Sequence, residues 1–118
     1  MRLKFIFIIT FLVCLSTVCF PQAKIKAIQA KNFVGKRVIV TGIVAQISES
    51  TTGGIILNIG ERFRYNELVA VINKPDLGNF VNIIECRGRT VEITGTITGS
   101  KGSPQIILKN TVQIKILY

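Results

Sequence analysis

Residues 35–44 read GKRVIVTGIV and residues 88–97 read GRTVEITGTI, so this short chain states nearly the same phrase twice. In each copy, apolar residues recur at every second position with one glycine in the series. The positions are Val38, Val40, Gly42 and Val44 in the first copy, and Val91, Ile93, Gly95 and Ile97 in the second. A period of two is typical of a strand with one buried face. Both copies are therefore predicted to be strands, and a glycine inside a strand permits a bend or a close approach.

The first copy has an apolar outer face as well, made of Ile39, Ile43 and Ile47. Something is expected to cover it, and the nearest candidate is a short N-terminal helix of two turns within residues 23–36, ended by Gly35. Ile28 and Phe33 would anchor that helix on the body of the protein. The alternative is that the isoleucine face binds a partner protein.

Five further segments complete the pattern. Residues 55–59 (IILNI) and 68–73 (LVAVIN) are predicted strands, separated by polar, glycine-containing connectors. Residues 76–86 predict a helix with Asp76 at its start, Gly88 past its end and an apolar stripe at helical spacing. Residues 104–110 predict a strand with Ile106 and Leu108 inward, and residues 111–117 a further extended segment. The stripe consists of Leu77, Phe80, Val81 and Ile84.

A helix between the third and fourth strands of a small all-β domain is the layout of the OB-fold, a five-stranded Greek-key barrel. The two repeated phrases and residues 101–117 (KGSPQIILKNTVQIKIL) resemble strands of bacterial OB-fold domains of the nucleic-acid-binding kind, found alone or appended to exported nucleases. The resemblance covers residues 35–117. It implies that the first and fourth strands, which carry the repeated phrases, lie side by side.

The first 23 residues have the layout of a secretory signal. Arg2 and Lys4 precede an apolar run over residues 5–15, which at about 11 residues is shorter than the roughly 20 of a membrane-spanning helix. We therefore expect export to the periplasm or medium, cleavage after Cys19 or near Ala23, and no membrane span afterwards. Residues 24–118 then form one OB-fold domain.

The composition argues against most catalytic chemistry. The chain has no His, its six acidic residues are scattered, and Cys86 is the only cysteine beyond residue 23. The commonest general base and metal ligand is thus missing, and so is a cysteine-rich zinc site. We expect no enzyme, no metal and no cofactor. Cys86 is expected to be buried at the end of the helix, the alternative being a reactive thiol.

Charge favours a polyanion as partner. Residues 24–118 carry 13 Lys and Arg against 6 Asp and Glu, a net charge of +7, which attracts nucleic acid and other polyanions. The alternative is a soluble protein that is merely basic.

The candidate binding residues surround the face that OB-folds use. Residues 62–65 (RFRY) interleave two cations with two aromatics, a combination that holds single strands through phosphate contacts and base stacking. Phe63 could instead pack under the barrel, with the arginines solvated. The predicted nucleic-acid-binding residues are Arg62, Phe63, Arg64, Tyr65, Lys74, Lys101 and Lys109.

The strands of this face carry no outward aromatic, so binding is expected to be weak, salt-dependent and directed mostly to phosphate. The runner-up ligand is a small molecule, an oligosaccharide or a component of the cell envelope.

Overall fold

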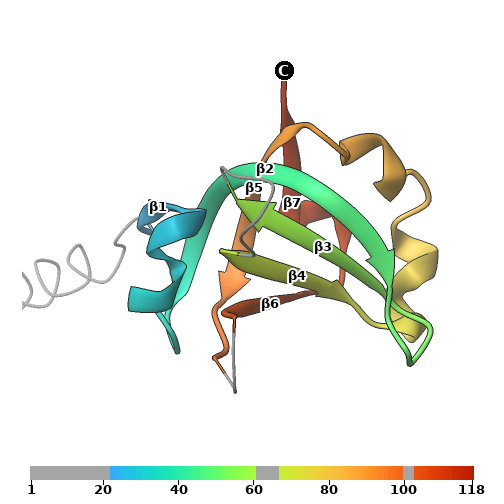
Figure 1. Ribbon diagram of the computed structural model, residues 1–118, viewed down its shortest axis with the longest axis horizontal. Coiled ribbons are helices and arrows are strands. Elements are labelled where there is room, and N and C mark those ends of the chain that lie inside the picture. Colours follow the sequence, from blue (N-terminus) through green and yellow to red (C-terminus); the bar gives the residue numbers. More distant parts are fainter. Residues whose placement is uncertain (1–21, 61–66, 100–102) are drawn as a thin grey trace, which may run out of the picture.

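The chain folds into a curled, mixed β-sheet with short helices at two of its ends (Figure 1). The computed structural model describes residues 22–60, 67–99 and 103–118. Within these residues the strands are β1 (Lys24–Lys26), β2 (Arg37–Glu49), β3 (Ile55–Gly60), β4 (Leu68–Ile72), β5 (Thr90–Thr96), β6 (Gln105–Leu108) and β7 (Ile114–Leu117). The helices are all 3-10 turns: η1 (Ala27–Asn32), η2 (Lys74–Asn79), η3 (Ile83–Cys86) and η4 (Thr111–Gln113).

The sheet has the order β6-β4-β3-β2-β5-β7, with β1 beside the first part of β2. The two repeated phrases form β2 and β5, which are antiparallel neighbours with Val40 opposite Ile93, as predicted. β4 and β6 are parallel, and an isolated bridge between Thr98 and Gln105 links the end of β5 to β6. The protein is mainly β with an OB-like topology, so the predicted fold class is confirmed in outline.

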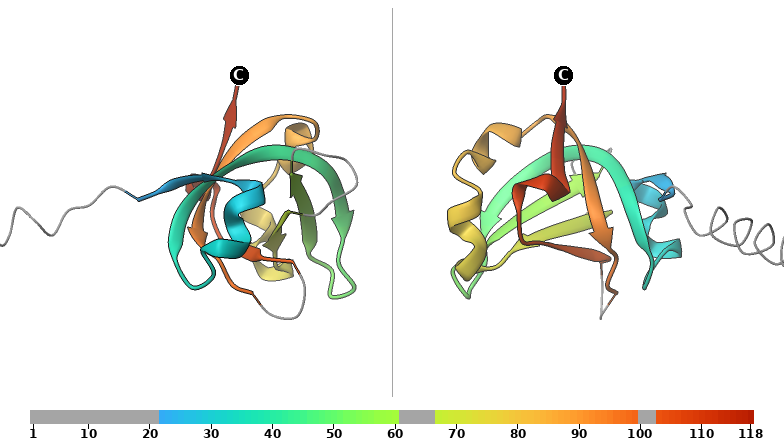
Figure 2. Two further views of the ribbon diagram at one scale, coloured as in Figure 1. Left: turned by 60° about the vertical axis from the view of Figure 1, so that its left-hand side comes forward. Right: turned by 180° about the vertical axis from the view of Figure 1, so that it is seen from behind.

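The count of five strands was wrong, because both ends of the chain add a strand to the sheet. β7 pairs antiparallel with β5 and leads to the C-terminus, which points away from the body (Figure 2). β1 pairs parallel with β2 at Ile39, where a helix was predicted. Ile25, the middle residue of β1, is buried, and its burial explains why this segment joins the sheet.

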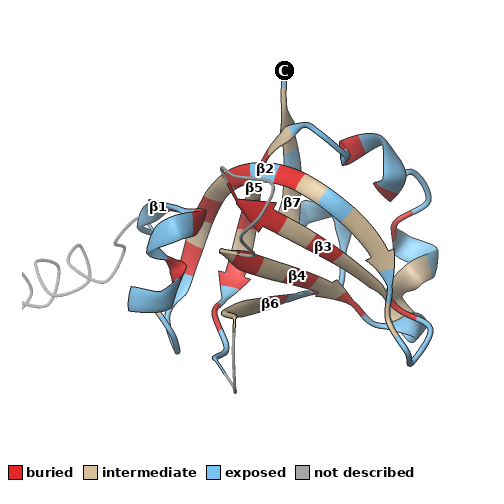
Figure 3. Cartoon of the chain, in the orientation of Figure 1, coloured by how far each residue is buried: buried red, intermediate tan, exposed pale blue. Residues whose placement is uncertain are grey.

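The core fills the inside of the curl, where buried residues alternate with more exposed ones along β4, β5, β6 and the first part of β2 (Figure 3). Ile106 and Leu108 of β6 are fully buried, as predicted. A Cβ at Gly42 would stand 2.5 Å from Ile59 Cγ2, and one at Gly95 would stand 2.7 Å from Ile106 Cγ2. The repeated glycines therefore admit neighbouring side chains to the core, a close approach of the kind predicted.

A β-bulge in β2 overturns the predicted outer face of isoleucines. The pairing with β3 shifts between Val44 and Gln46, so Ala45 is an extra residue and the alternation reverses after it. Ile47 then lies opposite the buried Leu57 and packs against the core. Ile43 remains on the outer face, 38% exposed, and Ile39 is half-buried. The three isoleucines do not form one surface.

The N-terminal helix exists as η1, but it does not cover the outer face of β2. Ala27 and Ala30 are fully buried, and a Cβ at Gly42 would stand 3.1 Å from Ala27 Cβ, on the core side of β2. Ile28 is 52% exposed, so its predicted role as an anchor was wrong, whereas Phe33 does pack against the core. The helix closes one open end of the curl, and Gly35 follows it with a φ of 85°.

The helix predicted over residues 76–86 is two 3-10 helices, and its stripe has a different period. The buried or half-buried hydrophobic side chains are Leu77, Phe80, Ile83 and Cys86, spaced by three. Three residues per turn is the 3-10 period, whereas the prediction assumed 3.6. Val81 and Ile84 were assigned to the buried face but are 86% and 67% exposed. Within the described ranges, the helices are too short and too polar to cross a membrane.

Candidate functional site

The outer face of β3, β4 and β6 is uncharged. Residues paired across adjacent strands share a face, so the pairing register defines two rows that cross four strands. One row is Ser48, Ile56, Val71 and Ile107, and the other is Gln46, Asn58, Val69 and Gln105. The described strands therefore offer aliphatic and carboxamide side chains, with no ring on which a base could stack.

Lys74 and Lys109 lie at one end of this face. They follow Ile72 of β4 and Leu108 of β6, which are partners in the parallel pair, and both lysines are exposed. The stem of Lys74 runs along the turn before β3, because a Cβ at Gly53 would stand 3.1 Å from Lys74 Cδ. The structure thus brings together two of the seven predicted residues. Arg62, Phe63, Arg64, Tyr65 and Lys101 lie outside the described residues.

A groove of about 490 Å³ begins at the edge of the same face. Ile107, the last residue of the aliphatic row, lines it together with Lys109, and Arg37 stands on its other side. The rest of the lining is Gly95, Val112 and four residues with hydroxyl or amide groups, namely Thr96, Thr98, Asn110 and Gln113; no acidic residue is among the described residues that line the groove. Two cations beside hydroxyl and amide donors form a site suited to an anion.

Each cation of the groove is placed by strand pairing. Arg37 is the first residue of β2 and is paired with Thr96 of β5, whereas Lys109 directly follows β6. β5 and β6 are bridged at Thr98 and Gln105. The groove therefore lies where the curled sheet closes on itself.

Gln113 of η4 holds the two sides of this closure together. Its Nε2 donates to the carbonyl oxygens of Thr94 at 3.2 Å and Ile107 at 3.1 Å, so one amide spans β5 and β6. Its Oε1 accepts from the backbone N–H groups of Lys109 at 2.7 Å and Asn110 at 3.3 Å. A single side chain thus fixes the backbone around Lys109.

Arg37 is the functional candidate that the sequence prediction missed. The signal was present, because the strand it begins was predicted and was expected to lie beside the strand that contains Thr96. The sequence prediction did not include the meeting of β5 with β6, which brings Arg37 and Lys109 into one groove.

The described residues contain no group of three or more His, Cys, Asp and Glu that could hold a metal ion. Cys86 is buried, as predicted, and its Sγ donates to the carbonyl of Ile83 at 2.8 Å. Burial raises the pKa of the Cys86 thiol, and a hydrogen bond from the backbone N–H of Cys86 opposes this only in part. The thiol therefore stays protonated at neutral pH, which disfavours a nucleophilic role.

No protein-family model matches this sequence, and no curated protein matches it. Solved structures do match. An OBody, AM1L10, bound to hen egg-white lysozyme has a TM-score of 0.61 at 22% identity, over 84% of this chain and 97% of that one.

Two natural proteins match over their OB-like parts. A chain of the Stn1-Ten1 complex of S. pombe has a TM-score of 0.53 at 18% identity, over 70% of this chain and 59% of that one. A putative aspartyl-tRNA synthetase from Leishmania major Friedlin has a TM-score of 0.54 at 12% identity, over 86% of this chain and 22% of that one. These similarities support the OB-like fold.

Proposed function

We propose that this protein binds single-stranded nucleic acid with little sequence preference and does so without catalysis. The observation that carries the proposal is the groove in which Arg37 and Lys109 stand beside threonine hydroxyls, with no described acid in the lining. The groove meets the uncharged β3–β4–β6 face at Ile107. A phosphate backbone would follow the cations, and the bases would lie on the aliphatic row.

The net charge supports a polyanion rather than a neutral ligand. The whole chain carries +9 at pH 7, and a cationic surface raises both the local concentration and the association rate of polyanions. The OB-like neighbours include a tRNA synthetase, which is consistent with this class of ligand. In the absence of a stacking ring on the described strands, phosphate contacts would dominate and sequence would matter little.

Fluorescence anisotropy with a labelled oligothymidine at low salt tests the proposal. Exposed ion pairs contribute roughly 0.2–1 kcal/mol each, so Arg37→Ala combined with Lys109→Ala should weaken binding by about 2- to 30-fold. Arg87→Ala is the matched control, because Arg87 is an exposed arginine that does not line the groove. No binding by the unmodified protein, or equal losses in the control, would contradict the proposal.

A second arm of the experiment tests the residues predicted from sequence alone. Arg62→Ala combined with Arg64→Ala should weaken binding further if the RFRY segment also contacts the strand. The same oligonucleotide, recovered and run on a gel, should remain uncut, because we propose binding without hydrolysis. Cleavage that persists in freshly purified protein would overturn the non-enzymatic assignment.

We also propose that the protein is exported and loses residues 1–23. The basic start and the short apolar run are the support for this step. N-terminal sequencing of the protein recovered from periplasm or medium should begin near residue 24. A chain that stays in the cytoplasm and begins at Met1 would contradict it.

The alternative ligand is an oligosaccharide, and one observation favours it. Gln46, Asn58 and Gln105 form a row of carboxamides across the outer face, and carboxamides both donate to and accept from sugar hydroxyls. A thermal-shift screen separates the two ligands. Stabilisation by oligosaccharides together with none by oligonucleotides would replace nucleic acid with sugar as the ligand.

A further inference from the structure

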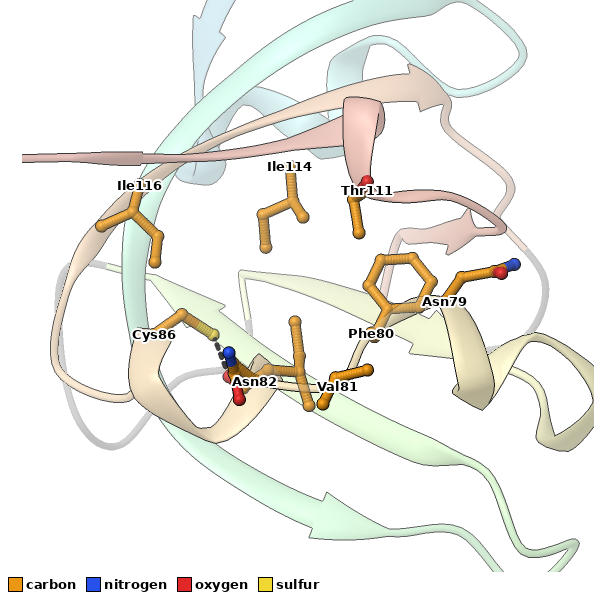
Figure 4. Close-up of a pocket in the computed structure, with 9 residues that line it drawn as sticks. Asn79, Phe80, Val81, Asn82, Cys86, Thr111, Ile114 and Ile116 are labelled. Atoms are coloured by element: carbon orange, nitrogen blue, oxygen red, sulfur yellow. Dashed lines mark hydrogen bonds between the residues drawn. The ribbon is translucent and has the colours of Figure 1, made fainter.

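A second cavity, of about 340 Å³, adjoins the basic groove at η4, where Thr111 lines the cavity and Val112 lines the groove, and it has a different chemistry. Its walls are η2–η3 on one side and η4–β7 on the other (Figure 4). Phe80, Ile114 and Ile116 point into it, with Cys86 and Ile116 at one end and Asn79 at the other. It is lined mostly by apolar groups and lies in the size range of small-molecule sites.

The cavity follows from the 3-10 period of the segment that closes this end of the sheet. At three residues per turn, Phe80, Ile83 and Cys86 all point inward, while Val81 and Ile84 point outward. Ile83 and Cys86 of η3 line the cavity on one side, and Ile114 and Ile116 of β7 line it on the other. Val81 also lines the cavity and is 86% exposed, so it stands at the mouth.

We propose that this cavity binds a single acyl chain of about ten carbons that ends in a carboxylate. A volume of about 340 Å³ is at the lower end of the range for small-molecule sites, which suits one unbranched acyl chain. Decanoate has this chemistry, with its chain against the apolar lining and its head outside. The lining residues include no charged side chain that would need an ionic partner inside.

The head group is assigned by charge at the Cys86–Ile116 end. The backbone N–H of Arg89 donates to the carbonyl of Cys86 at 2.9 Å, which ties Arg89 to the cavity wall. Arg89 Cζ also lies 5.8 Å from the ring centroid of Tyr118, two residues beyond Ile116. Both side chains are exposed. An exposed guanidinium beside an apolar cavity complements a carboxylate on an apolar chain.

The test is a titration of the full chain with sodium decanoate, followed by the carbon-13 methyl signals of isoleucine. Saturable shifts at Ile83, Ile114 and Ile116, with none at Ile25 in β1, are expected. Val81→Trp should abolish the shifts by blocking the mouth. Ile84→Trp is the matched control, since Ile84 is exposed on the same segment but does not line the cavity. It should leave binding unchanged.

The head-group assignment has its own arm. Arg89→Ala should weaken decanoate binding severalfold and leave decanol binding unchanged, because decanol has the same chain without the charge. The proposal is overturned if millimolar decanoate gives no shifts or if Val81→Trp still binds. It is also overturned if sedimentation shows that the cavity face joins two copies of the chain and decanoate does not displace them.

Discussion

Replacing Gln113 by Glu tests the side-chain NH2 group of this residue, which links β5 to β6. The substitution keeps the shape and the acceptor for the backbone N–H groups of Lys109 and Asn110. It removes the Nε2 donor and turns a carboxylate oxygen toward the carbonyls of Thr94 and Ile107. Only the two bonds that span β5 and β6 are lost.

Those two bonds set the size of the effect. A typical hydrogen bond contributes a net stabilisation of about 0.5–1.5 kcal/mol. Losing both bonds should therefore lower the free energy of unfolding by about 1–3 kcal/mol. The bond to Ile107 is solvent-exposed and the bond to Thr94 is partly buried, which favours the lower half of that range. In a domain of this size, 1 kcal/mol corresponds to roughly 4–8 °C in Tm.

Urea unfolding at neutral and acidic pH is the assay. A protonated carboxyl regains one donor, so the penalty of Gln113→Glu should shrink below about pH 4. Gln46→Glu is the matched control, because Gln46 is exposed on the outer row, and it should change stability by less than about 0.5 kcal/mol. A penalty equal to that of the control, or one that does not shrink in acid, refutes the closing role of Gln113.

Three further predictions concern the core. Gly42→Ala should cost about 1–3 kcal/mol in unfolding experiments, because its Cβ would stand 2.5 Å from a core methyl group; Gly78→Ala, with open space around it, should be neutral within about 0.5 kcal/mol. Ile47→Ala should cost about 1–3 kcal/mol and Ile43→Ala no more than about 1 kcal/mol, and the reverse order would disprove the bulge. Burial raises the pKa of the Cys86 thiol above its ordinary value of 9.0, so the unfolded chain ionises first. The stability from this group is therefore constant below about pH 9 and falls above it. Cys86→Ala, compared by urea unfolding from pH 7 to 10, should lack that part of the fall; an unchanged pH profile would contradict the burial of the thiol.

The strands and their neighbours could be predicted because their physical cause is local. Alternation at period two marks β2 and β5, and the two glycines sit where side chains from other strands need space. The predictions failed where a single inserted residue reverses the alternation of inward and outward side chains. The single extra residue at Ala45 reverses every later side chain of β2, and nothing in the alternating sequence around it signals where a bulge occurs.

The helical segments were harder for a related reason. Phe80 follows Leu77 by three residues, and this spacing fits a 3-10 helix as well as an α-helix. The sequence alone therefore does not separate the two kinds of helix. The kind of helix decides whether Ile83 or Ile84 is buried, and it thereby sets the shape of the apolar cavity. Tertiary packing settles this choice, which a local pattern does not contain.

The candidate site was predictable only in part. Lys109, inside the strand predicted over residues 104–110, was selected as a cation that could add to a basic face, and the structure sets it in a groove. Arg37 enters that groove from a strand 72 positions away in the chain, through the pairing of β2 with β5 and the closure at β6. Gln113 carries no sequence signal at all, because a lone glutamine in a polar turn looks like any solvated residue.

The salt dependence of oligothymidine binding tests the central claim most directly. For single strands, the slope of log K against log salt concentration is about −0.7 for each phosphate neutralised. If Arg37 and Lys109 each neutralise one phosphate, replacing both by alanine should reduce the steepness of that slope by about 1.4, and Arg87→Ala should leave it unchanged. The same slope in all three proteins would show that the groove is not where the phosphates bind.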